Sequence, residues 1–230
     1  MQLSIITTCK GRLDHLRYTL PLFAGQHGVE HEVIVVDYSD PDECHRWIAC
    51  QPQRNIRAVC VPDRPHFNLS HARNCGARIA RGGVLVFLDA DVLAPPSLMV
   101  QVMELFASSR APGVVLATRF LRSQGQVAVL AGVFHAVRGY DETLEGWGYE
   151  DNDFADRVEH AAGPMARSPR GWVHLIEHDD QLRTEHYAIQ KDQSHARNMA
   201  IAADVSRVVN PYGYGRLHAR NSASPPWASR

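Results

Sequence analysis

The chain has 230 residues, of which 45% are hydrophobic and 21% charged, and its formal net charge is −1 at neutral pH. These values are typical of a soluble globular protein with one sizeable core. A net charge near zero argues against a protein that coats nucleic acid, and the sequence has no apolar stretch approaching the ~20 residues of a membrane span. The five scattered cysteines, without a CxxC pair, indicate reduced thiols rather than a disulfide framework or structural zinc.

The first half of the sequence alternates strand and helix patterns. Apolar runs predict strands at residues 3–8, 31–37, 56–61 and 83–88, and helices are predicted at residues 13–23, 41–50, 69–80 and 96–107. Such alternation predicts an α/β fold, a single Rossmann-like domain whose mostly parallel central sheet is flanked by helices. Because the first core strand begins at once, we see no signal peptide and expect a cytoplasmic protein.

The second half is less regular. Residues 114–120 and 127–133 are predicted to be strands added antiparallel to the sheet, and residues 173–176 a short strand. Residues 151–161 and 184–208 have helical patterns. We expect a nucleotide-binding half over 1–92, a second half over 93–209 that completes the site, and an irregular tail over 210–230.

The most informative motif is Asp89-Ala90-Asp91, directly after the apolar run at 83–88. An apolar run of this kind reads as a strand buried on both faces, and its carboxyl end lies where open α/β sheets bind ligands. Two carboxylates so close repel each other unless a cation compensates them. A divalent metal that holds a diphosphate is the natural compensation, so the motif predicts a metal-assisted transferase that acts on a nucleotide-sugar.

Asp37 and Arg73 are two further candidates in the first half. Asp37 ends the second predicted strand and can accept hydrogen bonds from a base or ribose, although Asp is also favoured in turns and helix caps. Arg73 lies one turn into a helix that Asn68 or Ser70 caps, within reach of a phosphate. The alternative for Arg73 is an exposed helical arginine.

A glycine-flanked tryptophan, Trp147, precedes an acidic cluster that includes Glu150 and Asp151. Two glycines predict a flexible loop, and the indole can cover the face of a sugar. Acids at a helix start can also be explained by the helix dipole. A loop that closes over substrate and delivers a carboxylate base fits the pattern better.

His178 follows a short strand pattern beside acids and is a candidate third metal ligand. Any one of 13 histidines can equally be structural or on the surface. Between Asp91 and His178 there is no local ligand spacing, so this assignment depends on the resemblance described next.

In their order and spacing, these segments resemble family 2-type glycosyltransferases of the GT-A fold. The second half most resembles the β-1,4-galactosyltransferase and polypeptide N-acetylgalactosaminyltransferase group. The matching segments are residues 5–16, 35–40, 67–76, 88–91, 146–153 and 176–178.

The resemblance implies a role for each candidate residue. Thr8, Lys10 and Arg12 would lie in the loop that holds the nucleotide. Asp37 would recognise the uracil or ribose, and Arg73 would support the nucleotide or diphosphate.

For the reacting groups, the resemblance implies that Asp89, Asp91 and His178 bind Mn²⁺ (or Mg²⁺), with imidazole favouring Mn²⁺. Trp147 would line the donor sugar, and Glu150 would bind acceptor or sugar hydroxyls. Asp151 would be the general base of a single inverting displacement. Arg183 lies in a segment that would close over the diphosphate, or is an exposed lid arginine.

Three departures from the family pattern concern substrate choice. Tyr149 replaces the second glycine before the acids, and Leu175 stands where some galactosyltransferases have a methionine ligand. Residues 129–133 lack the aromatic pair of galactose-specific enzymes. The donor is therefore expected to be a UDP-hexose or UDP-N-acetylhexosamine of open identity.

The acceptor is left open among a saccharide, a lipid-linked glycan, a small molecule and a peptide. Animal members of the group are membrane-anchored and carry disulfides. Because neither an anchor nor disulfides are expected for this sequence, it is expected to be a bacterial cytoplasmic relative. A nucleotidyltransferase is disfavoured because the loop after the first strand has one glycine, Gly11. A non-catalytic nucleotide- or sugar-binding protein is disfavoured by the retained acids, and a dinucleotide-dependent dehydrogenase by the lack of GxGxxG.

Overall fold

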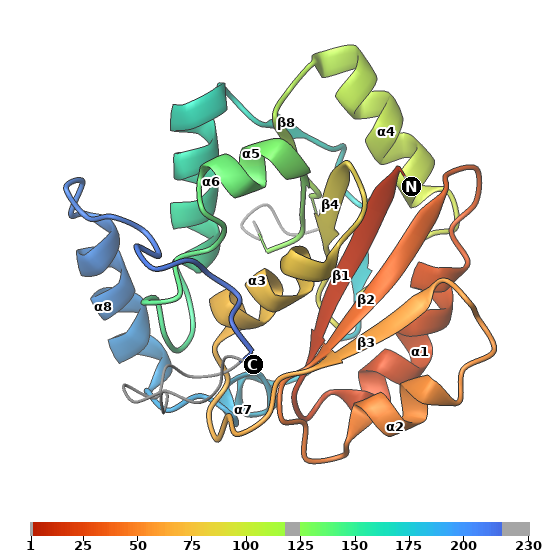
Figure 1. Cartoon of the computed structure of the whole chain (residues 1–230), viewed down its shortest axis with the longest axis horizontal. Helices are drawn as coiled ribbons and strands as arrows, with labels where there is room; N and C mark the ends of the chain where they lie inside the picture. Colours follow the sequence, from red (N-terminus) through yellow and green to blue (C-terminus); the bar gives the residue numbers. More distant parts are fainter. Residues whose placement is uncertain (1, 118–124, 218–230) are drawn as a thin grey trace, which may run out of the picture.

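The structure is a computed structural model that describes residues 2–117 and 125–217. Its central sheet has seven strands in the order β3-β2-β1-β4-β7-β6-β8 (Figure 1). The strands are β1 (Leu3–Cys9), β2 (His31–Asp37), β3 (Ile56–Cys60), β4 (Val84–Phe87), β6 (Gly113–Val115), β7 (Val127–Leu130) and β8 (Ala166–Arg167).

The sheet is parallel across its first four strands and mixed beyond them. β1 pairs in parallel with both β2 and β4, and β3 pairs in parallel with β2. β7 is antiparallel to β4 and to β6, which confirms the predicted antiparallel additions. The parallel strands are apolar on both faces because helices cover both sides of the sheet.

Two layers of helices enclose the sheet (Figure 1). On one face α1 (Leu13–Ala24), α2 (Cys44–Ala49) and α4 (Leu98–Ser109) pack into one apolar cluster. On the other face α3 (Leu69–Ile79), α5 (Ala131–Ala136) and α6 (Glu150–Ala162) build the second cluster. Asn68 caps α3 by accepting a hydrogen bond from the His71 amide at 2.9 Å, as its place in the sequence predicts.

Several predicted boundaries were wrong. Residues 131–133 were expected to continue a strand but form α5, because the Ala131 amide bonds the Gly83 carbonyl at the end of the ladder. Of the predicted helix at 184–208, residues 191–202 form α8 (Lys191–Ala202), and a separate short helix, α7 (Asp180–Thr184), ends at the first residue of the predicted range. Between them, the His186 carbonyl accepts from the Phe67 amide at 2.8 Å, which turns the chain back toward the sheet edge.

Two predictions fall partly outside the described residues. The predicted strand at 114–120 ends at Val115, and its residues 118–120 are not described. In the predicted tail, 210–217 contains no helix or strand, but Asn210 is buried and donates to the Arg138 and Tyr140 carbonyls. Residues 218–230 lie outside the described range.

A second, two-stranded sheet positions part of the site. β5 (Val92–Leu93) pairs antiparallel with β9 (His174–Leu175), and the Ile176 amide donates to the Asp91 carbonyl at 2.8 Å. This pairing brings the chain after β9 alongside the end of β4. Among the helices of the described ranges, none is long and apolar enough to cross a membrane.

Candidate active site

A cleft of about 700 Å³ opens at the carboxyl ends of β1 and β4. Ten of the twelve sequence-predicted residues line it: Thr8, Lys10, Arg12, Asp89, Asp91, Trp147, Glu150, Asp151, His178 and Arg183. The other two, Asp37 and Arg73, are buried and are not among the residues that line it. The structure therefore brings together side chains from both halves of the chain in one cavity.

Asp91 and His178 form a close pair in this cleft. The His178 Nε2 atom lies 2.9 Å from Asp91 Oδ2, although the two residues are 87 positions apart. The other oxygen, Asp91 Oδ1, is buried and has no hydrogen-bond partner within residues 2–117 and 125–217. Burial, and then the charge of Asp89, raise the pKa of Asp91 above its usual range. An unpartnered carboxylate oxygen beside an imidazole is a donor set that fits a divalent transition metal.

Asp89 faces a different set of partners. Its Oδ1 accepts from Arg73 at 3.0 Å and its Oδ2 from Gln126 at 2.7 Å. Its own amide donates back to the Gln126 side chain at 2.8 Å. Among the described residues, Asp89, Asp91 and His178 are thus not a compact set of three donors, and Asp89 would need another side-chain rotamer to share an ion with the other two.

Arg73 connects the two acidic regions of the cleft. It is only 2% exposed, and it donates to Asp151 at 2.5 Å, to Asp89 and to the Gly125 carbonyl at 2.8 Å. Its guanidinium also lies 5.0 Å from the centre of the Tyr140 ring. Burial by itself lowers the pKa of Arg73, but Tyr140, Asp151 and Asp89 outweigh it and hold the pKa well above its usual value. Arg73 is therefore a permanent buried cation.

Glu150 and Asp151 are the first two residues of α6, and their carboxyl groups have different electrostatic surroundings. Burial, followed by the charge of Asp151, raises the pKa of Glu150 to about 8, and its Oε2 is buried without a hydrogen-bond partner among the residues described. Burial raises the pKa of Asp151 as well, while the Arg73 ion pair opposes that shift. At neutral pH this arrangement favours an ionised Asp151 beside a protonated Glu150.

The loop after β1 contributes one free polar group to the cleft. The Lys10 ammonium donates hydrogen bonds to the backbone carbonyls of Tyr38, Ser39 and Arg64, at 3.2, 2.9 and 2.8 Å. Arg12 donates through Nη2 to the Leu182 carbonyl at 2.7 Å, but its Nη1 is buried with no partner among the described residues. Arg12 is thus the cation of this loop that can receive an anion.

The Asp37 carboxylate bonds the backbone of the turn that follows β2, which is one of the two roles that the sequence left open. It is 3% exposed, and its carboxylate accepts from the Asp40 amide at 2.9 Å and from the His45 amide at 3.1 Å. The His45 ring lies 2.5 Å from the same carboxylate. A role for Asp37 in recognising the nucleotide remains a prediction, since its oxygens already have partners within the chain.

The loop around Trp147 is held by α8, which corrects the role given to its glycines. Gly146 and Gly148 have φ of +79° and +96°, and a Cβ on either would lie 2.5 or 2.6 Å from Ser194 or His195. Ser194 bonds both backbone groups of Trp147 at 3.0 Å. The glycines therefore permit a left-handed backbone and close contact with α8.

The cleft residues that sequence reasoning missed include Gln126, His186, Tyr187 and His195. Gln126 is 2% exposed and fixes Asp89, and His186 packs against Gly11. Each acts through a contact between distant parts of the chain. A polar residue just before the apolar run 127–130 was the single local signal for Gln126.

Arg183 lies at the outer rim of the cleft. Its side chain is 41% exposed and pairs with Asp180 at 3.4 Å on the same helix. An exposed pair of this kind contributes little to stability, so Arg183 can exchange Asp180 for another anion.

Comparison with known proteins agrees with this architecture. The model of the family described as "Glycosyl transferase family 2" matches residues 4–157, more than half of the 230 residues. No curated protein matches the sequence.

Solved structures share the fold at low sequence identity. The S. aureus TarS 1-349 structure in complex with UDP-GlcNAc superposes with a TM-score of 0.70 at 14% identity, over 88% of this chain and 66% of that one. Another TarS 1-349 structure superposes with a TM-score of 0.65 at 14% identity, over 76% of this chain. The matched region spans 60% of the length of that structure. The mannosyltransferase PcManGT from Pyrobaculum calidifontis, in complex with GDP-Man and Mn²⁺, gives 0.62 at 19% identity, over 74% and 55% of the two chains. The fold matches these glycosyltransferase structures.

Proposed function

The chain belongs to glycosyl transferase family 2, and from this membership and the geometry of the cleft we propose that it transfers a hexose or N-acetylhexosamine from a UDP-sugar to an acceptor hydroxyl. We further propose a metal-dependent reaction with inversion at the anomeric carbon. The GT-A fold, with its single α/β domain, is the premise for this mechanism.

One observation carries the proposal, namely that Arg73 bonds both Asp89 and Asp151. Asp89 belongs to the carboxylate pair at the end of β4, and Asp151 begins α6. Their shared contact with Arg73 supports the proposal that one cleft holds both the phosphate end of the site and the base. A donor and an acceptor bound there would have their reacting atoms side by side, which lowers the entropic cost of the reaction.

The donor end is proposed to bind a nucleoside diphosphate. Arg12 offers a buried, unpartnered Nη1, and Arg183 offers an exposed guanidinium at the rim. Arginine suits phosphate because its planar fork can donate two parallel hydrogen bonds. A UDP-sugar is favoured because the segment 146–153 resembles UDP-sugar enzymes and the TarS structure of highest similarity given above contains UDP-GlcNAc.

Asp91 and His178 would hold a divalent ion, with Asp89 joining them after a rotamer change. The GT-A neighbour PcManGT contains Mn²⁺, and an imidazole ligand favours Mn²⁺ over Mg²⁺. When bound, such an ion neutralises charge that develops on the leaving diphosphate.

The chemical step is proposed to use Asp151 as the base. Its carboxylate accepts the proton of the acceptor hydroxyl as the hydroxyl oxygen forms its bond to the anomeric carbon. At the same time the bond from that carbon to the diphosphate oxygen breaks, and UDP leaves with the bonding electrons. Arg73 keeps the base oriented, and a protonated Glu150 can donate a hydrogen bond to a sugar hydroxyl. Trp147 at the cleft wall would cover one sugar face.

The first test is thermal unfolding of the full chain with UDP plus Mn²⁺, against UDP plus EDTA. Ligand at ~100 times its dissociation constant stabilises by about 2.7 kcal/mol, or roughly 5–10 °C for a chain of this size. We expect a rise that needs both nucleotide and metal, followed by UDP release from one member of a UDP-sugar panel. A rise with GDP alone would change the donor class, pyrophosphate release would indicate a nucleotidyltransferase, and no rise with any nucleotide would contradict the proposal.

A further inference from the structure

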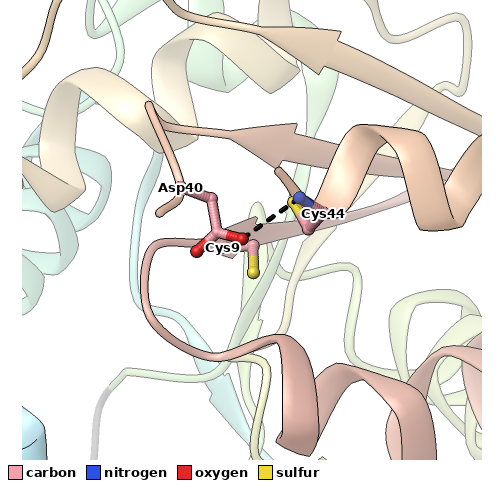
Figure 2. A group of neighbouring side chains, drawn as sticks. All are labelled: Cys9, Asp40 and Cys44. Atoms are coloured by element: carbon pink, nitrogen blue, oxygen red, sulfur yellow. Dashed lines mark hydrogen bonds between the residues drawn. The ribbon is translucent and has the colours of Figure 1, made fainter. Parts of the chain in front are cut away.

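Two cysteines and an aspartate meet beneath the loop that follows β1. Cys9 is the last residue of β1, Cys44 is the first residue of α2, and Asp40 lies in the loop between β2 and α2 (Figure 2). Their donor atoms all lie within 4.8 Å of one another. The two cysteines are 0% exposed and Asp40 is 5% exposed. This group, called the dithiol cluster below, is separate from the proposed catalytic residues.

The carboxylate of the dithiol cluster is held in place by the backbone. Asp40 Oδ1 accepts from the Gly11 amide at 2.5 Å, and Asp40 Oδ2 accepts from the Cys44 amide at 3.1 Å. These bonds orient the carboxylate toward the two sulfur atoms and leave further lone pairs on each oxygen. Carboxylates that ligate metals are commonly oriented by such hydrogen bonds.

Lys10 follows Cys9 in the chain, but its ammonium donates to three backbone carbonyls, and no ion pair of the dithiol cluster with a lysine or arginine is seen among the described residues. The hydrogen bond that the Cys44 thiol makes to Cys9, and then burial, raise the pKa of Cys44 far above its usual value, and burial raises the pKa of Asp40. Two thiols and a carboxyl thus share one small buried volume, where a bound cation would compensate their negative charge.

We propose that Cys9, Asp40 and Cys44 form a binding site for one thiophilic metal ion of the Zn²⁺ type, which ties β1 to α2. Two thiolates and a carboxylate favour Zn²⁺ and softer ions over Mg²⁺. Donors at about 2.0–2.3 Å on one tetrahedral zinc ion lie ~3.3–3.8 Å apart, so donor atoms within 4.8 Å of one another would move closer by about 1 Å to bind it. Water can take the remaining coordination position. Binding one divalent ion would release the two thiol protons to solvent.

The proposed ion would act on the cleft through its neighbours. Gly11 is bonded to Asp40 and is followed by Arg12, the free cation of the donor loop. Holding Asp40 between two thiolates would restrain this loop and the start of α2. The role is structural, and no catalytic step is assigned to the ion.

A second group in the same region offers a matched control. Asp37, His45 and Cys60 also have donor atoms within 4.8 Å, but Cys60 is exposed and the histidine already bonds the aspartate. Cys50 is the other exposed cysteine. Replacing Cys50 and Cys60 therefore removes two thiols from outside the dithiol cluster, as many as replacing Cys9 and Cys44 removes from inside it.

The experiment is a titration of the full chain, stripped with a chelator under reductant, with Co²⁺ and then Zn²⁺. Sulfur-to-cobalt charge transfer reports thiolate ligands and does not report an ion on Asp91 and His178. We expect one equivalent of Co²⁺ with this band, displaced by Zn²⁺, in the natural chain and in the double variant Cys50→Ser, Cys60→Ser. The double variant Cys9→Ser, Cys44→Ser should lose the band, and Asp40→Asn should weaken Co²⁺ binding at least tenfold.

Three results would overturn the proposal. One is a charge-transfer band that survives in the Cys9, Cys44 variant or disappears in the Cys50, Cys60 variant. Another is no band in the natural chain while circular dichroism shows it folded. The third is a mass two hydrogens lower with both thiols unreactive under reductant, which would identify a disulfide instead. Zn²⁺ should also raise the thermal midpoint of the natural chain and of Asp91→Asn alike. Failure of the proposed dithiol site can therefore be distinguished from failure of the proposed catalytic metal site at Asp91 and His178.

Discussion

Arg73 and Asp151 meet at 2.5 Å in the floor of the cleft, although 78 positions separate them in the chain. The arginine is 2% exposed and also binds Asp89, so it joins the end of β4 to the start of α6. Removing one partner of such a buried pair leaves an uncompensated charge. The contact therefore makes the proposed base part of the folded core as well as of the reaction.

Asp151→Asn tests the proposed base. Asparagine keeps the shape and can still accept a hydrogen bond from Arg73, but it cannot take a proton from the acceptor. We expect kcat to fall by ~10²–10⁴-fold while the UDP- and Mn²⁺-dependent rise in thermal midpoint is retained. Asp156→Asn, on the exposed face of the same helix, is the control and should keep its rate. A near-normal kcat in Asp151→Asn would assign the base to another group.

The metal pair is tested by Asp91→Asn and His178→Ala. Asp91 Oδ1 has no hydrogen-bond partner in the part of the chain that the structure describes, so its main expected use is to bind an external ion. Both variants should lose most of the roughly 5–10 °C rise with UDP and Mn²⁺. His174→Ala changes an exposed histidine on the neighbouring strand and should keep the rise. Unchanged Mn²⁺-dependent binding in Asp91→Asn would remove the assignment.

Glu150 predicts a pH dependence of stability. Its pKa is raised from 4.5 to about 8 by burial and then by Asp151. Between these values the folded chain holds a proton that the unfolded chain has lost, so the free energy of unfolding falls as pH rises, by up to about 1.4 kcal/mol per pH unit. Glu150→Gln mimics the neutral acid and should flatten this fall in urea titrations from about pH 5 to about pH 8.

The control for this measurement is Glu104→Gln, an exposed glutamate on α4. The free energy of unfolding of Glu104→Gln should change with pH as it does in the natural chain. If the free energy of unfolding of Glu150→Gln falls with pH as steeply as in the natural chain and in Glu104→Gln, the buried carboxyl does not hold its proton. The assignment of Glu150 as a neutral donor would then be wrong.

Gly148→Ala tests the contact between the Trp147 loop and α8. The new Cβ would lie 2.6 Å from His195 Nδ1, at a backbone φ of +96°. We expect a loss of about 1–3 kcal/mol, read as a lower thermal midpoint, together with a higher KM for donor. Gly132→Ala is the matched control, because its Cβ meets nothing within 4 Å in α5 and should stabilise by ~0.5–1 kcal/mol. Equal midpoints of the two variants would show that α8 does not hold the loop.

The sequence by itself determined the elements whose signals are local. The uninterrupted apolar runs identified the parallel strands, and the motif Asp89-Ala90-Asp91 identified the ligand-binding edge, because burial on both faces excludes polar residues until a strand ends. Asn68 was identified as a helix cap because a cap bonds within three residues. Five of the predicted site residues line one cleft for the same reason, since strand ends share one sheet edge: Thr8, Lys10 and Arg12 lie at or just after the end of β1, and Asp89 and Asp91 follow β4.

Only the tertiary structure decided which of these residues touch. The pairing of β5 with β9 brings His178 to Asp91, and packing of α8 requires the glycines beside Trp147. Cys9 and Cys44 have no motif spacing, yet they share one buried volume. Such contacts depend on register and packing between segments that are distant in sequence, and neither hydrophobic periodicity nor capping carries that information.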